Sequence, residues 1–197
     1  MTSPPPVGRP AYRDMTVAGW LDAVAAPEPA PGGGGAAAFT AALGAALVAM
    51  AARFAPASYG RARDIAARAD ALRERALTLA EEDATAYRAV LEAYRLPKDT
   101  EGRRDRILKA LTRACEVPLE IAEVAAEVAA LGADIGEHGN PNLLGDAATG
   151  VHLAVAAARS AAELVRINAR LGDLGTGPGD RARELLRAAE SAAGRLG

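Results

Sequence analysis

The sequence predicts an all-α protein, folded as a bundle of about five or six helices with antiparallel neighbours. Half of the 197 residues are hydrophobic, yet only 4% are aromatic, and about a quarter are Ala. Ala, Leu, Arg and Glu favour helices, whereas residue types that favour strands are sparse. Apolar positions recur at steps of three and four residues over long segments that are separated by short turns. Long helices joined by short turns are typical of a helical bundle.

The first part of the chain predicts an arm, a short helix, a loop and a buried helix. Residues 1–13 are expected to form a flexible N-terminal arm. Thr16 is a suitable N-cap for an amphipathic helix over residues 17–25. A loop rich in Pro and Gly then leads into a helix over residues 36–52, and the stretch 29–52 carries no charge. Such a stretch can cross a membrane, but its content of Pro, Gly and Ala favours a helix buried among neighbours.

Four further helices complete the predicted bundle. The apolar periodicity and the intervening Gly and Pro residues give helix 61–96, helix 101–131, turn 136–142, helix 143–171, a flexible joint over 172–179 and helix 181–196. Pro118 lies inside the second of these helices and is expected to kink or break it. We expect one helical domain over residues 14–173, with residues 174–197 forming a C-terminal helix that packs on the same domain.

Charge and cysteine content exclude several classes of function. The formal net charge is −2 with both signs scattered along the chain, so no nucleic-acid partner is expected. The single cysteine, Cys115, excludes a disulfide framework and a Cys-rich zinc site within one chain, and it favours a cytoplasmic setting. Cys115 lies on an apolar face, which is more typical of a core residue than of a nucleophile. Two isolated histidines, His138 and His152, do not form a metal site.

Four consecutive glycines, residues 32–35, precede the uncharged helix. With the next alanines they match the spacing of a dinucleotide fingerprint, but no predicted strand precedes them and no acidic residue follows at the required distance. Backbone N–H groups at a helix N-terminus can bind an anion or a carbonyl edge, so this run is a candidate binding site. The alternative is a flexible hinge or a tight contact between helices.

Asp83 is the most informative acidic residue in the sequence. It shares the helical spacing of Leu79 and Val90 on the apolar stripe, so its carboxylate is predicted on the buried face of the 61–96 helix. Burial raises the pKa of a carboxyl group, and a buried acid of this kind is a candidate general acid or base. The alternative is a structural ion pair with an Arg of a neighbouring helix.

Asn140, Asn142 and Asp146 form a polar cluster where the fifth predicted helix begins. An Asn at an N-cap and an Asp near the first turn stabilise a helix, so simple capping is one interpretation. A carboxylate and two amides beside a turn are also a candidate ligand site. Near the end of the same helix, Arg166 and Asn168 are either solvated or placed to meet an anionic ligand.

Eight short segments carry a family resemblance. They are VAGWLD (17–22), PGGG (31–34), ALGAAL (42–47), AEED (80–83), AYRLPK (93–98), EVPLE (116–120), GNPN (139–142) and VRIN (165–168). Together, in this order, they resemble the cyclodeaminase/cyclohydrolase family of formiminotetrahydrofolate cyclodeaminase and a bacterial methenyltetrahydrofolate cyclohydrolase. The resemblance covers about residues 14–173. Gly35 and Gly145 stand where that family commonly has Ser.

The resemblance implies an all-helical homodimer that acts on a folate substrate without a metal or redox cofactor. It implies either a cyclodeaminase, which converts 5-formimino-tetrahydrofolate to 5,10-methenyl-tetrahydrofolate and ammonia, or a methenyltetrahydrofolate cyclohydrolase. Either reaction moves protons, and Asp83 and Asp146 are the expected catalytic groups. The residues expected to bind the substrate are Gly32, Gly33, Gly34, Tyr94, Lys98, Asn140, Asn142, Arg166 and Asn168. The alternative is a non-catalytic helical dimer that binds a folate-like ligand or a protein partner.

Overall fold

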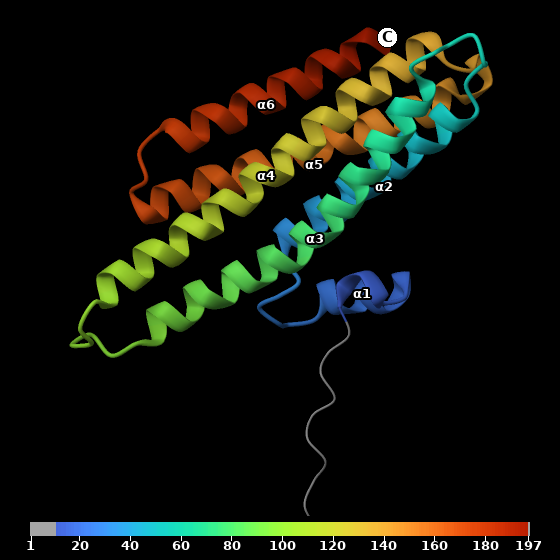
Figure 1. Cartoon of the computed structure of the whole chain (residues 1–197). Coiled ribbons are helices and arrows are strands. Elements are labelled where there is room, and N and C mark those ends of the chain that lie inside the picture. Colours follow the sequence, from blue (N-terminus) through green and yellow to red (C-terminus); the bar gives the residue numbers. More distant parts are fainter. Residues whose placement is uncertain (1–10, 197) are drawn as a thin grey trace, which may run out of the picture.

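The structure is a computed structural model that describes residues 11–196, and the regular elements of that range are all helices (Figure 1). The α-helices are α1 (Val17–Ala25), α2 (Gly33–Arg53), α3 (Ala62–Arg95), α4 (Arg103–His138), α5 (Leu144–Gly172) and α6 (Gly177–Ala193). Short 3₁₀ helices lie at Tyr12–Asp14, Pro141–Leu143 and Gly194–Leu196. The prediction of an all-α fold with about six helices is confirmed for the described residues.

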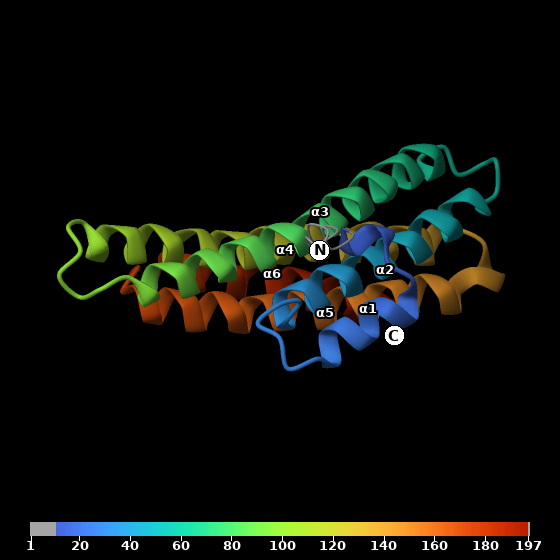
Figure 2. The ribbon, with the colours of Figure 1, turned by 90° about the horizontal axis from the view of Figure 1, so that it is seen from below.

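Helices α2, α3, α4 and α5 form an antiparallel bundle. α2 and α4 each pack against both α3 and α5, and α6 lies along α4 and α5. The five long helices run side by side in Figure 1, and Figure 2 shows the short helix α1 on the outside, beside α2. Trp20 of α1 stacks on Phe39 of α2 with the ring centroids 4.2 Å apart. Because α2 and α5 are antiparallel, the first turn of α2 and the last turns of α5 meet at the same end of the bundle.

Small residues let the helices of the bundle approach closely. A Cβ added to Gly44 of α2 would lie 2.8 Å from the carbonyl oxygen of Gly150 in α5, so a larger residue does not fit at this crossing. Among the described helices, only α2 is long and apolar enough to cross a membrane, and 61% of its most apolar window is buried inside the bundle. α2 is packed as a core helix, as the sequence predicts.

Three predicted boundaries were wrong. α2 begins at Gly33, so its first turn is built from glycines that were expected to form a loop. α4 continues to His138, and the turn predicted over 136–142 is therefore helical in its first part. Gly136 is not a helix stop there but a packing residue, since an added Cβ would lie 2.7 Å from the Leu196 side chain. α6 begins at Gly177, which shortens the predicted joint to residues 173–176.

Two segments are more regular than the sequence suggested. Pro118 does not break α4, which runs through it without interruption while the ring is fully buried. Residues 1–10 of the predicted arm lie outside the described range, but its last residues are fixed on α3. Tyr12 is buried and its backbone N–H donates to the Glu81 carboxylate, and Arg13 pairs with Glu74 at 3.1 Å.

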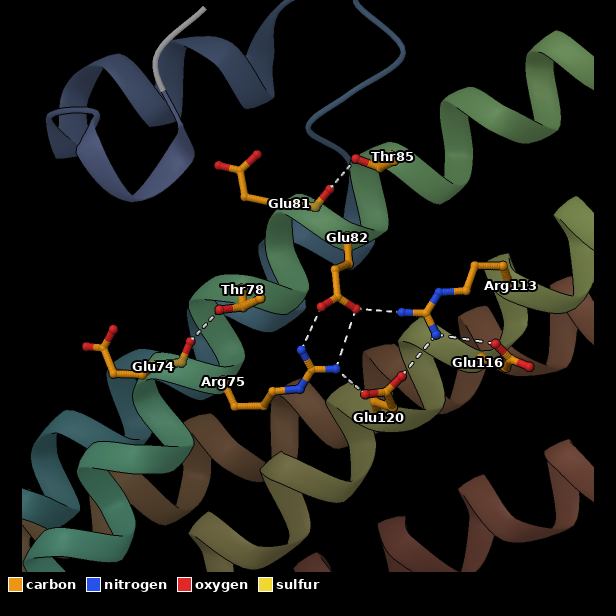
Figure 3. A network of polar contacts seen from close by, with 9 residues as sticks. All are labelled: Glu74, Arg75, Thr78, Glu81, Glu82, Thr85, Arg113, Glu116 and Glu120. Atoms are coloured by element: carbon orange, nitrogen blue, oxygen red, sulfur yellow. Dashed lines mark hydrogen bonds and ion pairs between the residues drawn. The ribbon is translucent and has the colours of Figure 1, made fainter.

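An ion-pair network joins α3 to α4 (Figure 3). Glu82 of α3 lies 2.6 Å from Arg75 and 2.5 Å from Arg113, and both guanidinium groups also bind Glu120 of α4. The network turns Glu82 towards α4. The next residue, Asp83, lies about 100° further around the helix and therefore points to α2 rather than into the network.

A second polar cluster lies where the α2–α3 connection meets the C-terminal end of α4. The carboxylate of Asp134 in α4 accepts a hydrogen bond from the Tyr59 hydroxyl at 2.6 Å and lies 2.5 Å from Arg61. Nδ1 of His138 is 3.2 Å from the same carboxylate, and His138 is the last residue of α4 rather than part of a turn. Burial, and then the bond to Asp134, raise the pKa of Tyr59 to about 12. The cluster fixes the α2–α3 connection on the end of α4.

Candidate functional site

A cavity of about 370 Å³ lies where α2 begins and α5 ends. Its walls come from the loop before α2, the first turn of α2, and parts of α3, α4 and α5. The lining residues are Pro29, Ala30, Gly32, Gly33, Gly34, Asp83, Tyr87, Ala114, Pro118, Leu164, Ile167, Asn168 and Leu171. The structure thus brings together five of the residues that the sequence predicted for the site: Gly32, Gly33, Gly34, Asp83 and Asn168.

The Asp83 carboxylate lies directly against the first turn of α2. A Cβ on Gly34 would be 2.0 Å from Asp83 Oδ1, so only glycine leaves room for the carboxylate in this position. The backbone N–H of Gly35 donates to Asp83 Oδ2 at 3.1 Å. At Gly35 itself an added Cβ would be 3.5 Å from Pro31 Cβ, which is an ordinary contact. The structure shows a tight contact at Gly34, whose partner is Asp83, and it also places Gly32, Gly33 and Gly34 in the cavity wall, where binding through their N–H groups stays a prediction.

The surroundings of Asp83 raise the pKa of its carboxyl group towards neutral pH. Burial raises the pKa of Asp83 to about 6, and the hydrogen bond from the Gly35 N–H opposes this rise. No charged side chain among the described residues contributes to the shift, so the alternative of a structural ion pair with an Arg does not hold. A carboxyl group with this pKa can both take and give a proton near pH 6 to 7, which suits a general acid or base.

Polar groups from α2 and α5 complete the site around Asp83. The N–H groups of Gly33 and Gly34 lie in the first turn of α2, where a helix leaves backbone donors without internal partners, and the helix dipole places positive charge. Asn168 of α5 donates from Nδ2 to the carbonyl oxygen of Ala114 in α4 at 2.6 Å. The cavity therefore offers backbone donors, one titrating carboxyl group and one oriented amide.

The apolar part of the cavity wall was not predicted from the sequence. Tyr87, Leu164, Ile167 and Leu171 are its largest side chains, and Tyr87 remains 45% exposed. Tyr87 follows Asp83 by four residues, so it lies one helical turn further along the same face of α3. That spacing was the available signal. The sequence carried no such signal for the α5 residues, because it does not show which end of α2 packs against them.

Five of the nine predicted substrate-binding residues do not line the cavity, and three of these five lie in α3, in the turn after it and in α5. Tyr94 is in the last turn of α3 with 48% of its surface exposed, and Lys98 lies in the turn that follows α3. Arg166 is on the outer face of α5, where it forms an exposed ion pair with Glu163 at 2.5 Å. Of the two interpretations of Arg166, the structure shows the solvated one.

Asn140, Asn142 and Asp146 lie at the opposite end of the bundle from the cavity. Asp146 is at the start of α5 and Asn168 near its end, and 22 residues of helix separate them by roughly 33 Å. The Asn140 side chain accepts from the Asn142 N–H at 3.0 Å and caps the 3₁₀ turn before α5. Within one chain, the expected catalytic pair of Asp83 and Asp146 is therefore not assembled. The sequence showed that Asp146 lies at the start of a helix. It did not show at which end of the bundle that helix starts.

The other reactive side chains have structural surroundings. Cys115 is buried, burial raises the pKa of its thiol, and Sγ contacts the Val165 carbonyl oxygen at 3.7 Å, so its assignment to the core is confirmed. Among the described residues, no group of three or more His, Cys, Asp or Glu side chains is placed to hold a metal ion.

The chain matches a known protein family and several of its members. Residues 16–173 match the family model described as formiminotransferase-cyclodeaminase. The chain is 38% identical to the methenyltetrahydrofolate cyclohydrolase of Methylorubrum extorquens over 168 residues, which cover 79% of each protein. It is 34% identical to the formimidoyltransferase-cyclodeaminase of Mus musculus over 146 residues, which cover 68% of this chain but only 26% of the mouse protein.

The fold gives the same result. The crystal structure of formiminotetrahydrofolate cyclodeaminase from Thermotoga maritima superposes with a TM-score of 0.84 at 25% identity, covering 93% of this chain and 94% of that one. The family model spans the glycine turn of α2, Asp83 and Asn168, that is, the polar residues of the cavity. The chain therefore belongs to the formiminotransferase-cyclodeaminase family.

Proposed function

We propose that this protein is a folate one-carbon enzyme that hydrolyses 5,10-methenyl-tetrahydrofolate, with Asp83 as the proton-transferring group. The observation that carries the proposal is the carboxylate of Asp83, mostly buried, free of ion pairs among the described residues and placed in the wall of a cavity beside backbone donors. The relative that supports this reaction is the cyclohydrolase that matches over 79% of both chains.

In this reaction water adds to the cationic methenyl carbon. As the new C–O bond forms, Asp83 takes one proton from the water, and its negative charge stabilises the cation in the poorly solvated cavity. Asp83 then gives the proton to N5 while the bond between this carbon and N5 breaks, and the hydroxyl proton of the adduct leaves to solvent. The product is 10-formyl-tetrahydrofolate. One carboxyl group with a pKa of about 6 serves as base and then as acid.

Cyclodeamination of 5-formimino-tetrahydrofolate is the second candidate, and the superposition with a formiminotetrahydrofolate cyclodeaminase favours it. In that reaction N10 attacks the formimino carbon and ammonia leaves. Asp83 takes the proton that N10 loses and gives it to the leaving nitrogen, which takes its third proton from solvent and departs as ammonia, leaving the methenyl cation. Both candidate reactions transfer only protons besides the bonds to carbon, so the proposal includes no metal or redox cofactor, and a chelator is expected to leave the rate unchanged.

The proposal includes a homodimer in the cytoplasm. Val17 and Leu21 of α1 and Leu43 of α2 are 78%, 54% and 56% exposed, and α2 carries no charge before Arg53. An uncharged apolar face can pair with the same face of a second copy. Only such a copy could bring an Asp146 to the cavity of its neighbour. Light scattering after size exclusion is expected to give a dimer for the wild type and a monomer for Leu43→Arg, and a monomeric wild type would refute the dimer.

The absorbance of 5,10-methenyl-tetrahydrofolate tests the activity in both directions. Purified protein is incubated with the methenyl compound, and separately with 5-formimino-tetrahydrofolate, and the uncatalysed rate is subtracted. Faster loss of the methenyl form identifies the cyclohydrolase, and faster appearance identifies the cyclodeaminase. If neither rate rises, the catalytic proposal fails. The non-catalytic alternative then predicts saturable folate binding without turnover.

A further inference from the structure

Pro118 removes one hydrogen bond of α4 in the wall of the cavity. In an α-helix the N–H of each residue donates to the carbonyl oxygen four residues earlier, so the oxygen of Ala114 would accept from position 118. Proline has no N–H and its ring crowds that same carbonyl group. The Ala114 oxygen therefore lacks its helix donor, although Ala114 is only 9% exposed and Pro118 is fully buried.

Asn168 supplies the missing donor from another helix. Its Nδ2 atom lies 2.6 Å from the Ala114 oxygen, which is the bond that α4 itself cannot make. A buried carbonyl group without a donor is unfavourable, so this bond has a strong reason to persist. Pro118, Ala114 and Asn168 all line the cavity, so the replacement takes place in its wall.

The bond also fixes which way the Asn168 amide points. A carbonyl oxygen accepts only from the NH₂ end of a carboxamide, so Oδ1 must be the atom left over. No described residue donates to Oδ1 in the structure. Besides the Asp83 carboxylate and the Tyr87 hydroxyl, Oδ1 is thus a further side-chain acceptor among the lining residues, and its orientation is set before any ligand binds.

We propose that Pro118 is a positioning residue for substrate binding. By leaving the Ala114 carbonyl group without a helix donor, it holds the Asn168 amide so that Oδ1 accepts a hydrogen bond from an N–H group on the heterocycle of the substrate. The assignment rests on the proposed function, because a reduced pterin ring carries N–H donors that fit such an acceptor. A proline inside a helix destabilises the helix, because it removes a hydrogen bond and crowds the preceding turn. Here the lost hydrogen bond orients a side chain of the site.

A double-mutant cycle on kcat/KM tests the coupling. Pro118→Ala restores an N–H donor within α4, so the Ala114 carbonyl group no longer depends on Asn168 and the amide is free to turn. We expect KM to rise and kcat/KM to fall about tenfold. The melting temperature should stay equal or rise. Asn168→Ala is expected to lower kcat/KM by a similar factor. The double variant should fall no further than Asn168→Ala alone. Pro178→Ala, at the half-buried first turn of α6, is the control substitution and should keep wild-type kinetics.

A purely structural role for Pro118 predicts different results. It predicts a lower melting temperature for Pro118→Ala, or losses that multiply in the double variant, and either result overturns the proposal. A wild type that turns over the substrate, combined with a Pro118→Ala variant of unchanged KM, overturns it as well. A wild type that turns over neither folate instead refutes the proposed function.

Side-chain NMR gives a readout that does not depend on activity. The NH₂ signals of Asn168, assigned by their loss in Asn168→Ala, are expected to exchange slowly with water in the wild type, and faster in Pro118→Ala. The exposed Asn142 provides the fast-exchange reference. If Asn168 exchanges as fast as Asn142 in the wild type, the bond to Ala114 does not hold the amide and the inference fails.

Discussion

At the scale of single residues, Asp83 combines a chemical role with a cost in stability. Burial raises its pKa from a usual value of 3.8 to about 6. The unfolded chain binds the proton less tightly, so the folded state is relatively favoured when the group is protonated. This contribution is fully present below about pH 4 and is lost as the pH rises through about 6.

The variant Asp83→Asn should therefore be more stable than the wild type above pH 6. An amide has no charge to bury and its oxygen can still accept from the Gly35 N–H. The shift from 3.8 to about 6 corresponds to about 3 kcal/mol as an upper value for the gain. Urea denaturation at pH 7.5 and pH 4 measures it. The gain should be absent at pH 4, and a variant less stable than the wild type at pH 7.5 would contradict the burial of an ionised carboxylate.

Gly34 and Gly35 offer a matched pair of substitutions in the same turn. Gly34→Ala places a Cβ 2.0 Å from Asp83 Oδ1 and must displace the carboxylate, so activity is expected to fall at least 100-fold, of the order found for a lost general base. Gly35→Ala meets only an ordinary contact with Pro31 and should remain active within a few-fold. Steady-state kinetics on both variants decides. Equal activity of the two variants would show that Asp83 is not held against Gly34 during turnover.

At this scale the sequence predicted the candidate acid but not its contacts. Asp83 could be predicted because its spacing placed a carboxylate on an apolar stripe. Its contact with Gly34 could not, because that contact depends on how deeply α2 and α3 approach each other. The bond from Asn168 to Ala114 was hidden for the same reason, since the missing N–H of Pro118 was visible but the helix facing it was not.

At the scale of the helices, packing overrides the local signals of Gly and Pro. Gly136 and Pro118 were expected to interrupt α4, yet the helix runs through both. Gly136 makes room for Leu196, and Pro118 leaves a carbonyl group that α5 satisfies. The long amphipathic segments were predicted correctly because periodicity over many residues reports a buried face. Boundaries depend on single contacts between helices, which periodicity does not contain.

The cluster around Asp134 is expected to stabilise the end of the bundle without affecting catalysis. Asp134→Ala removes the acceptor for Tyr59 and the partner of Arg61, and should lower the free energy of unfolding by about 2 kcal/mol, as for other hydrogen bonds to a charged group. Thermal denaturation measures the loss, with the exposed Asp99→Ala as control. The folded variant should keep wild-type kinetics, because the cluster lies at the other end of the bundle. A loss of kcat without a loss of stability would contradict this separation.

At the scale of the whole molecule, the structure separates the predicted site residues into two groups at opposite ends of the bundle. The glycine turn, Asp83 and Asn168 share one cavity, whereas Asp146 lies roughly 33 Å from Asn168 along α5, with Asn140 and Asn142 just before that helix. The second group was visible in the sequence as a polar cluster at a helix start, whereas the members of the first were visible only as separate candidates on three helices. Which helix ends meet is set by the antiparallel pairing of α2 and α5, and the local patterns carry no information about it.

The rate of 5,10-methenyl-tetrahydrofolate hydrolysis as a function of pH shows whether Asp83 transfers the proton. In the wild type kcat should rise with pH through an apparent pKa near 6, the value that burial gives Asp83. Asp83→Asn should lose at least 100-fold in kcat and the rise with pH, while Asp64→Asn, an exposed carboxyl group on the same helix, should match the wild type. If Asp83→Asn keeps the wild-type rate and pH profile, Asp83 does not transfer the proton and the account of this site is wrong.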